Sequence, residues 1–251
     1  MQNTEVNLTP LANCKQCPFN ETLKSVKKCK PGDACVMVKS GRQIDRFFKN
    51  NPAMAADYLD DDFWEMRAIA VRYAPQKKIS ELIADPDEAV RRAVAYRLPI
   101  DQLDPLLTDE DREVRITVAD RIPLEKLEKL VNDEDYLVRA YVARRLPEGR
   151  LFRMITDPDN HVRKIIAERL PQVSIILMSN DSDPDIRRIV AERADPEAVL
   201  DMLDDKEWMV RLVLAEKIDP IHLPILENDP EEDIRNIVAD RLNNQVHKST
   251  L

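Results

Sequence analysis

Four cysteines near the start of this sequence are the residues whose type and spacing could do chemistry. Cys14, Cys17, Cys29 and Cys35 follow the pattern C-x₂-C-x₁₁-C-x₅-C, and the 216 residues after them contain no cysteine. A CxxC pair lets two thiolates reach one metal centre across a tight turn, and two more cysteines complete the shell. The three histidines all lie beyond residue 160. A thiolate-only shell suits zinc or an iron–sulfur cluster.

The spacing alone leaves zinc and an iron–sulfur cluster both open. Structural zinc usually has two short pairs with about two to four residues between ligands, whereas the second pair here is split by five. A cubane cluster tolerates wider and irregular spacing. Pro18 follows Cys17 as in the Cys-Pro of ferredoxins, but the ferredoxin run itself is absent. The lysines at 15, 24, 27, 28 and 30 would offset the negative charge of either centre.

The compartment argues against disulfides or free thiols as the role of these cysteines. Residues 1–13 show neither the apolar run nor the cationic start of a signal peptide. No stretch reaches the length that spans a bilayer. We therefore expect a cytoplasmic protein without membrane contact, in which thiols stay reduced.

Other chemistry lacks its motifs, so we expect no enzyme. The radical-enzyme pattern Cx₃Cx₂C, a glycine-rich phosphate loop, HExxH and GxSxG are absent. Four cysteine ligands leave no open iron for Lewis-acid chemistry. Residues 1–50 carry nine Lys/Arg and four Asp/Glu, a balance of +5, and residues 51–251 a balance of −14. The acidic body argues against nucleic-acid binding, which needs a basic face.

The body of the chain is an internal repeat of 24 residues. An arginine recurs without insertion at Arg67, Arg91, Arg115, Arg139, Arg163, Arg187, Arg211 and Arg235. An aspartate lies six residues before each, at Asp61, Asp85, Asp109, Asp133, Asp157, Asp181, Asp205 and Asp229. A unit this short cannot bury its apolar face alone, but stacked copies can. The sequence therefore predicts a solenoid of eight repeats.

One unit, residues 85–108, indicates a helix and a shorter helical segment. Asp85 suits the N-cap and Pro86 the first helical position. Apolar residues at i, i+4 and i+8 then form one stripe, and Pro99 ends the helix. The nine residues between Pro99 and Asp109 are too few for a second full helix, so we expect a short or 3₁₀ helix. No alternation of period two occurs, and the prediction is all-α.

The repeated charges are expected to hold neighbouring repeats together. A second basic column lies six residues after the first in seven copies, from Arg97 to Arg241. Arginine can reach the capping aspartate of a neighbouring unit and form a bidentate pair. A complete column favours this inter-repeat ladder over a phosphate- or carboxylate-binding track, because a ligand would rarely need every copy.

The first repeat is expected to dock the cysteine-rich head. Bulky residues gather at this end, at Ile44, Phe47, Phe48, Tyr58, Leu59, Phe63, Trp64, Val71 and Tyr73. Terminal repeats must cover an exposed end of the core. The other end closes with the polar tail NNQVHKSTL.

The head and the 24-residue D-P-D-x-x-V-R-x-x-V-A-x-R-L-P units together resemble the leucine-rich repeat variant family, over nearly the whole chain. The resemblance implies a right-handed solenoid superhelix of alternating α-helices and short or 3₁₀ helices, without strands. It also implies a small N-terminal domain that carries a [4Fe–4S] cluster, with Cys14, Cys17, Cys29 and Cys35 as ligands.

We accordingly expect an iron–sulfur cluster domain at residues 1–50 and a solenoid at residues 51–251, with repeat cores at about 61–242 and a short polar C-terminal tail. The expected function is an iron–sulfur protein whose cluster carries or senses an electron and whose repeats bind an unidentified protein partner. The alternative is a structural cluster, or zinc, that staples a head with little core of its own. Nucleic-acid binding is a weaker alternative.

Overall fold

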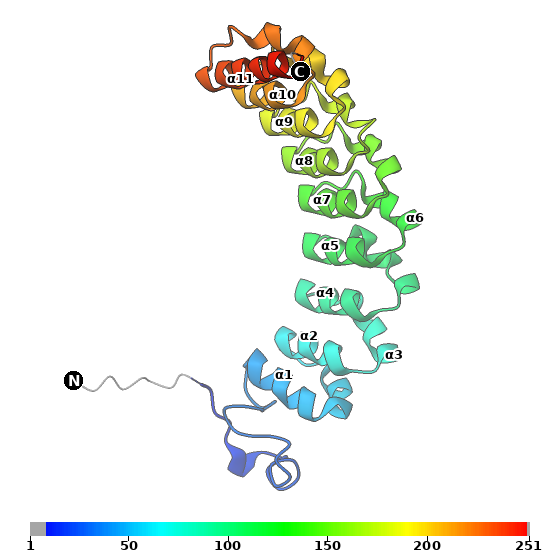
Figure 1. Cartoon of the computed structure of the whole chain (residues 1–251). Helices are drawn as coiled ribbons and strands as arrows, with labels where there is room; N and C mark the ends of the chain where they lie inside the picture. The colour runs from blue at the N-terminus through cyan, green and yellow to red at the C-terminus, as the bar shows by residue number, and fades with distance from the viewer. Residues whose placement is uncertain (1–8, 250–251) are drawn as a thin grey trace, which may run out of the picture. The chain divides into compact units, whose positions relative to one another are not determined.

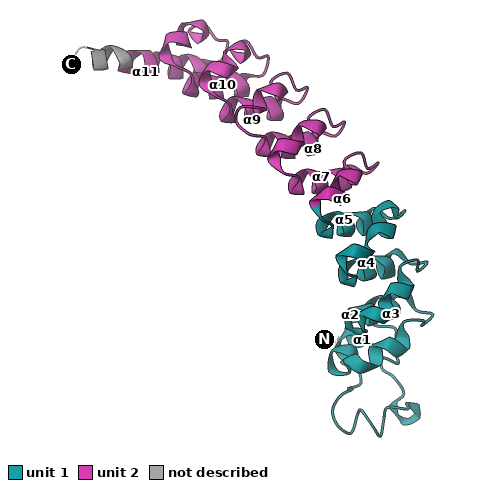
Figure 2. Ribbon diagram, turned by 90° about the vertical axis from the view of Figure 1, so that its right-hand side faces the viewer, with its two compact units in different colours: residues 1–123 teal, residues 124–251 magenta. Residues whose placement is uncertain are grey.

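The computed structural model describes residues 9–249 and divides into two compact units, residues 1–123 and 124–251 (Figure 2). The predicted boundary at residue 50 lies inside the first unit. Residues 1–8 of the segment inspected for a signal peptide, and the last two residues of the expected tail, lie outside the described residues. No helix in residues 9–249 is both long and apolar enough to cross a membrane.

The first unit places α-helices of ten residues beside shorter helical segments. Its α-helices are α1 (Gly41–Asn50), α2 (Trp64–Tyr73), α3 (Gln76–Ile79), α4 (Glu88–Arg97) and α5 (Arg112–Arg121). Its 3₁₀ helices are η1 (Cys14–Gln16), η2 (Pro52–Tyr58), η3 (Ser80–Leu82), η4 (Ile100–Gln102) and η5 (Asp104–Thr108). Helix α2 packs against α1 and α4, and α4 against α5.

The second unit continues the same alternation. Its α-helices are α6 (Leu124–Leu127), α7 (Tyr136–Arg145), α8 (Asn160–Arg169), α9 (Pro184–Arg193), α10 (Trp208–Lys217) and α11 (Glu232–Ser249). Its 3₁₀ helices are η6 (Glu128–Leu130), η7 (Glu148–Met154), η8 (Ile175–Met178), η9 (Pro196–Met202) and η10 (Pro220–Leu226). In Figure 1, α7 to α10 lie side by side as one layer and the short helices form a second layer.

The all-α solenoid of alternating α and 3₁₀ helices is confirmed. Residues 9–249 contain no strand, and a single isolated bridge joins Lys30 and Ala34. The apolar stripe of one unit is buried as predicted, with Val90 and Val94 fully inaccessible and Leu98 1% exposed. Leu103 from the short segment is also fully inaccessible. Each repeat therefore supplies both layers of a core that only its neighbours can complete.

The long helices begin two residues later than predicted. Asp87, not Asp85, is the N-cap of α4, and its carboxylate accepts the N–H of Ala89 at 3.0 Å. Asp85 accepts the N–H of Asp87 at 2.9 Å instead. Both oxygens of its carboxylate also accept hydrogen bonds from Arg67 of α2, so Asp85 is held away from the helix start. Pro86 thus precedes the helix. The same offset recurs at the N-caps Asp111, Asp135, Asp159 and Asp183.

The helix ends follow the prediction. Leu98, the residue before Pro99, leaves helical geometry with φ −59° and ψ 149°, and its N–H still donates to the carbonyl of Val94. Where Asp195 and Asp219 replace the proline, helices α9 and α10 still end at Arg193 and Lys217. At the far end of the second unit, α11 continues to Ser249 and includes most of the expected polar tail.

Candidate metal centre

The first two cysteines lie on one tight turn. Cys14 opens η1, and Cys17 follows it with its N–H donated to the carbonyl of Cys14 at 3.3 Å. The side chain of Asn13 caps this turn by accepting the N–H of Lys15 at 3.2 Å. The CxxC spacing is thus one turn of 3₁₀ helix, which brings both thiols to the same end of the head.

The last two cysteines flank a closed loop. Cys29 precedes Lys30 and Cys35 follows Ala34, and these two inner residues exchange backbone hydrogen bonds of 2.8 and 2.9 Å. Gly32 closes the loop with φ +73°, a conformation that side chains with a Cβ rarely adopt. The five-residue spacing, wider than in most zinc sites, is therefore the length of this loop.

The four thiols lie within electrostatic reach of one another. Burial raises the pKa of the Cys29 thiol, and the charges of Cys17, Cys35 and Cys14 raise it further, while Lys24 lowers it. Burial also raises the pKa of Cys35, whose sulfur accepts the backbone N–H of Met37. Cys35 is buried, and the other three are half-buried. The charges of the other three thiols thus act on Cys29, so all four cysteines lie in the same part of the head.

The four thiols do not form a preorganised site for a single metal ion. Among residues 9–249, no group of three or more His, Cys, Asp or Glu side chains is arranged to hold a metal ion. The four thiolates of a cubane cluster bind four different irons, so they lie farther apart than the ligands of one ion. The donor set, thiolate only and next to lysines, fits a cluster in charge and softness.

Polar contacts fix the head to the start of the helical layer. The N–H of Cys35 donates to the carbonyl of Gln43 in α1 at 3.0 Å. The side chain of Gln43, fully buried, donates to the carbonyl of Pro10 at 2.9 Å, and its Oε1 has no partner among the described residues. Asn51 donates to the carbonyl of Lys28 at 2.9 Å. Helix α1 and Asn51, the residue that follows it, therefore hold the backbone of the head at Pro10, Lys28 and Cys35.

Aromatic packing completes the docking of the head. Phe19 lies against Phe47 of α1, with ring centroids 5.8 Å apart. Phe48 meets Phe47 at 5.7 Å and Tyr58 at 5.4 Å. The docking role predicted for this end is right for these residues, but Trp64 is 43% exposed and takes no part in it. Trp64 is the first residue of α2, and its ring lies beside that of Phe63, with centroids 6.1 Å apart.

Comparisons with known proteins match both parts of the chain. A solved structure described as a leucine-rich repeat variant with a novel repetitive protein structural motif is 55% identical, with a TM-score of 0.88. The match covers 93% of this chain and 100% of that chain. The chain belongs to the leucine-rich repeat variant family. Its residues 136–159 match the family model for a leucine-rich repeat variant unit, and residues 10–57 match the model described as the LRV protein FeS4 cluster.

This leucine-rich repeat variant is therefore an iron–sulfur repeat scaffold, and neither family model describes a catalytic domain. A curated relative, an uncharacterized 27.7 kDa protein in the nifB 3′ region of Rhodobacter capsulatus, is 36% identical over 86 residues. That alignment covers 34% of this chain and 35% of the relative, so the chain matches about a third of that protein's length.

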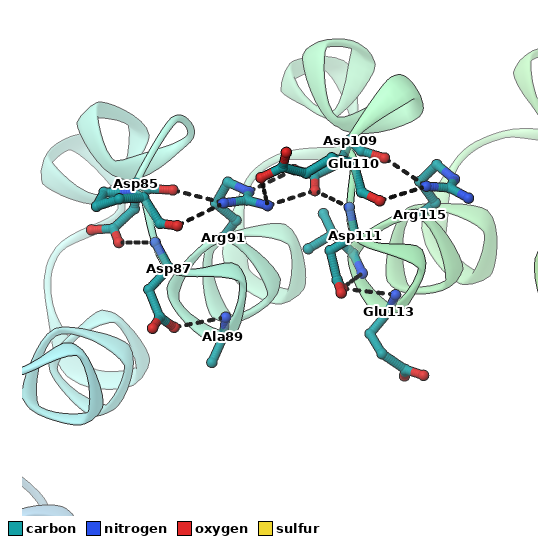
Figure 3. Close-up of polar contacts among 11 residues, drawn as sticks. Asp85, Asp87, Ala89, Arg91, Asp109, Glu110, Asp111, Glu113 and Arg115 are labelled. Carbon is teal, nitrogen blue, oxygen red and sulfur yellow. Dashed lines mark hydrogen bonds and ion pairs between the residues drawn. The ribbon is translucent and has the colours of Figure 1, made fainter.

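The first arginine column of the leucine-rich repeat variant forms the expected ladder (Figure 3). Arg91 of α4 donates from Nε and Nη2 to the two carboxylate oxygens of Asp109 in the next repeat, at 2.8 and 2.9 Å. Its Nη1 donates to the carbonyl of Asp85, 2.9 Å away in its own repeat. Equivalent pairs are Arg67–Asp85, Arg139–Asp157, Arg163–Asp181, Arg187–Asp205 and Arg211–Asp229. These guanidinium groups therefore hold neighbouring repeats together, as the inter-repeat ladder predicts.

In six of its seven copies, the second basic column donates to backbone carbonyls of the preceding repeat and not to the expected aspartates. Arg97 donates to the carbonyls of Val71 and Ala74 at 2.6 and 3.0 Å, where α2 ends. Lys217 bonds the carbonyls of Ala191 and Ala194 in the same way. These side chains satisfy carbonyls that the end of a helix leaves without partners. Each repeat is thus tied to its predecessor at the helix end and to its successor at the helix start.

Proposed function

We propose that this protein holds a [4Fe–4S] cluster through Cys14, Cys17, Cys29 and Cys35, that the cluster carries or senses an electron, and that the solenoid binds a protein partner. The observation that supports the proposal is that the thiols of Cys14, Cys17 and Cys35 act electrostatically on Cys29 inside a segment that matches an iron–sulfur family. We place the protein in the cytoplasm, where thiols stay reduced.

The chain's own residues would hold such a cluster and neutralise it. The CxxC turn would supply two thiolates and the loop closed by Gly32 the other two. The N–H of Met37 already points at the sulfur of Cys35, and hydrogen bonds of this kind stabilise thiolate charge and raise a cluster's potential. Lys24 offsets the charge at Cys29. When bound, the cluster supplies one-electron chemistry.

A structural cluster is the second candidate, and one observation favours it. Between residue 9 and α1 the head contains only η1 and a single bridge as regular backbone structure. A segment with so little core of its own often needs a metal group to order it. Zinc would serve as well in that role, although no group of side chains in residues 9–249 is arranged to hold a single metal ion.

The first test is the composition and reducibility of anaerobically purified protein. We expect broad visible absorption that bleaches with dithionite, with about four irons and four acid-labile sulfides per chain. Cys29→Ser should lose most of this iron, and Ser25→Ala, four residues away, should keep it. A colourless chain with one zinc would overturn the proposed cluster.

A second measurement separates a redox cluster from a structural one. A redox cluster should cycle reversibly while the amide hydrogen exchange of residues 9–40 stays unchanged between oxidised and reduced protein. A structural cluster that cannot be reduced at accessible potentials would contradict the electron-transfer role and leave the scaffold role in place.

A further inference from the structure

A groove of about 800 Å³ opens on the first unit beside the head. Its floor is built from small and apolar residues of α2 and α4, among them Ala68, Ile69 and Ala93. Two aromatic side chains stand over this floor, Trp64 with 43% and Tyr96 with 61% of its surface exposed. Large aromatics held on rigid helices and left in solvent are the residues that most often anchor a protein partner.

The rim of the groove is basic. Arg42, Arg72 and Arg92 line it from α1, α2 and α4, and all three are exposed. Their contacts within the chain are long. Arg42 reaches the carbonyl of Gly32 at 3.4 Å and Arg72 the carboxylate of Asp45 at 3.5 Å, while Arg92 is 3.9 Å from Glu113. These guanidinium groups therefore retain donors for an outside acceptor.

The two acidic residues of the groove are already engaged. Asp45 accepts a hydrogen bond of 3.0 Å from the hydroxyl of Tyr73. The carboxylate of Glu65 packs against Gly41 so closely that it leaves no room for a Cβ there. Gly41 is the first residue of α1, where the helix dipole favours a negative charge. The three arginines of the groove are thus more exposed than its two acidic residues, which are half-buried.

The groove is also close to the proposed cluster. Gly41, Arg42 and Asp45 line it, and between them in α1 lies Gln43, whose carbonyl accepts the N–H of Cys35. One helix therefore carries both a wall of the groove and a backbone contact to a cysteine. A partner seated here would lie next to the head.

We infer that this groove docks an acidic segment of a protein partner, with its carboxylates on the three arginines and an apolar or aromatic side chain between Trp64 and Tyr96. This deepens the proposed function, on which its link to electron exchange rests. Exposed polar groups on an open rim are typical of a macromolecular interface, since small ligands are usually enclosed by convergent polar groups. Nucleic acid is disfavoured because the acidic body would repel a polyphosphate that extends beyond the groove.

The test uses the full chain with its cluster and a short fluorescein-labelled peptide made of Glu, Asp, Leu and Phe. Fluorescence anisotropy should show saturable binding that weakens with salt. The double variant Arg72→Glu/Arg92→Glu should lower the affinity by about tenfold or more. The matched control is Arg188→Glu, because Arg188 is a partly exposed arginine at the same repeat position as Arg92 and lies in the second unit. It should change the affinity by less than about twofold.

The fluorescence of Trp64 reports peptide binding at the groove itself. The chain has two tryptophans, so Trp208→Phe leaves Trp64 as the sole indole. Its emission should shift when the acidic peptide binds and should stay unchanged with a peptide in which Gln and Asn replace the acids. Equal effects of the groove and control variants, no saturable binding, or tighter binding of oligothymidylate than of the acidic peptide would each overturn the inference.

Iron content and dithionite bleaching measured on the same samples keep the two ideas apart. Peptide binding by a chain whose cluster cannot be reduced would support the groove and contradict electron exchange. A reducible cluster without peptide binding would overturn the groove alone.

Discussion

The guanidinium group of Arg139 lies parallel to the carboxylate of Asp157, eighteen residues further along the chain, with N···O distances of 2.8 and 2.9 Å. The side chains are 9% and 4% exposed, so water cannot replace either partner. A third donor, Nη1, bonds the carbonyl of Asp133 at 2.8 Å. One side chain therefore ties the start of its own repeat to the start of the next.

Breaking this pair should be costly. Arg139→Ala leaves the buried carboxylate of Asp157 without its partner, and we expect a loss of about 3–5 kcal/mol in the free energy of unfolding. Urea denaturation followed by circular dichroism measures it. The double variant Arg139→Met/Asp157→Leu should lose less, because no charge is then left buried. The control Arg188→Ala removes an exposed pair with Glu192 and should cost no more than about 0.5 kcal/mol. Equal losses in all three variants would contradict the ladder's role.

Acid should weaken the arginine–aspartate pairs between repeats. The hydrogen bond from Arg211 holds the pKa of Asp229 below its usual value of 3.8. Burial raises the pKa of Asp205, but the hydrogen bonds from Arg187 and from the backbone N–H of Glu207, together with the nearby positive charges, outweigh it and the pKa is lowered. Groups with a lower pKa in the folded state stabilise it above 3.8 and lose this contribution as the pH falls through the folded pKa.

We therefore expect the melting temperature to be flat near neutral pH and to fall steeply as the pH drops below about 4. Calorimetry on the intact chain measures this. Asp229→Asn should be less stable at neutral pH and should show a shallower fall in acid. An unchanged acid slope in this variant would refute the assignment.

Phe47 should decide whether the head stays docked. It is 1% exposed and contacts both Phe19 of the head and Phe48. Phe47→Ala should cost about 3–5 kcal/mol and reduce the iron retained after gel filtration, because the cysteines lose their support. The control is Phe152→Ala, where the ring is 55% exposed and lies in the second unit. Full iron retention in Phe47→Ala would show that the head holds its shape without α1.

Gly32 should be needed for the loop between the last two cysteines. With φ at +73°, an added Cβ would be strained and would approach Leu11 at 3.0 Å. Gly32→Ala should therefore destabilise the head by about 1–2 kcal/mol and lower its iron content. Gly149→Ala is the matched control, because a Cβ there meets nothing within 4 Å. Similar iron content in the two variants would argue against a strained loop.

The period of 24 residues was enough to predict the solenoid and the arginine–aspartate ladder, because each repeats the same local physics eight times. The N-cap was misplaced because the sequence shows two aspartates, Asp85 and Asp87, that both suit the role. Only the position of Arg67 on the preceding helix decides which one is free to cap. The partners of the second basic column could not be predicted either, because they are backbone carbonyls, which every residue carries and which no sequence pattern distinguishes.

The head was predictable in its chemistry and less so in its construction. The four cysteines, together with the expectation of a reducing compartment, pointed to a metal group. The loop at Gly32 and the buried amide of Gln43 were missed, although a glycine between closely spaced cysteines is a signal that could have been used. The groove was also missed, because its arginines come from three different helices that share no motif.

The ladder has a consequence for how such a chain can change in length. Each repeat carries the arginine of one joint and the aspartate of the joint before it. Deleting residues 157–180 would bring Asp181 to the place of Asp157, so Arg139 would meet the same carboxylate in the same geometry. A gene that gains or loses whole units therefore still encodes a closed series of joints. Slippage by any other number of codons would leave an arginine facing the wrong residue and a buried charge without its partner.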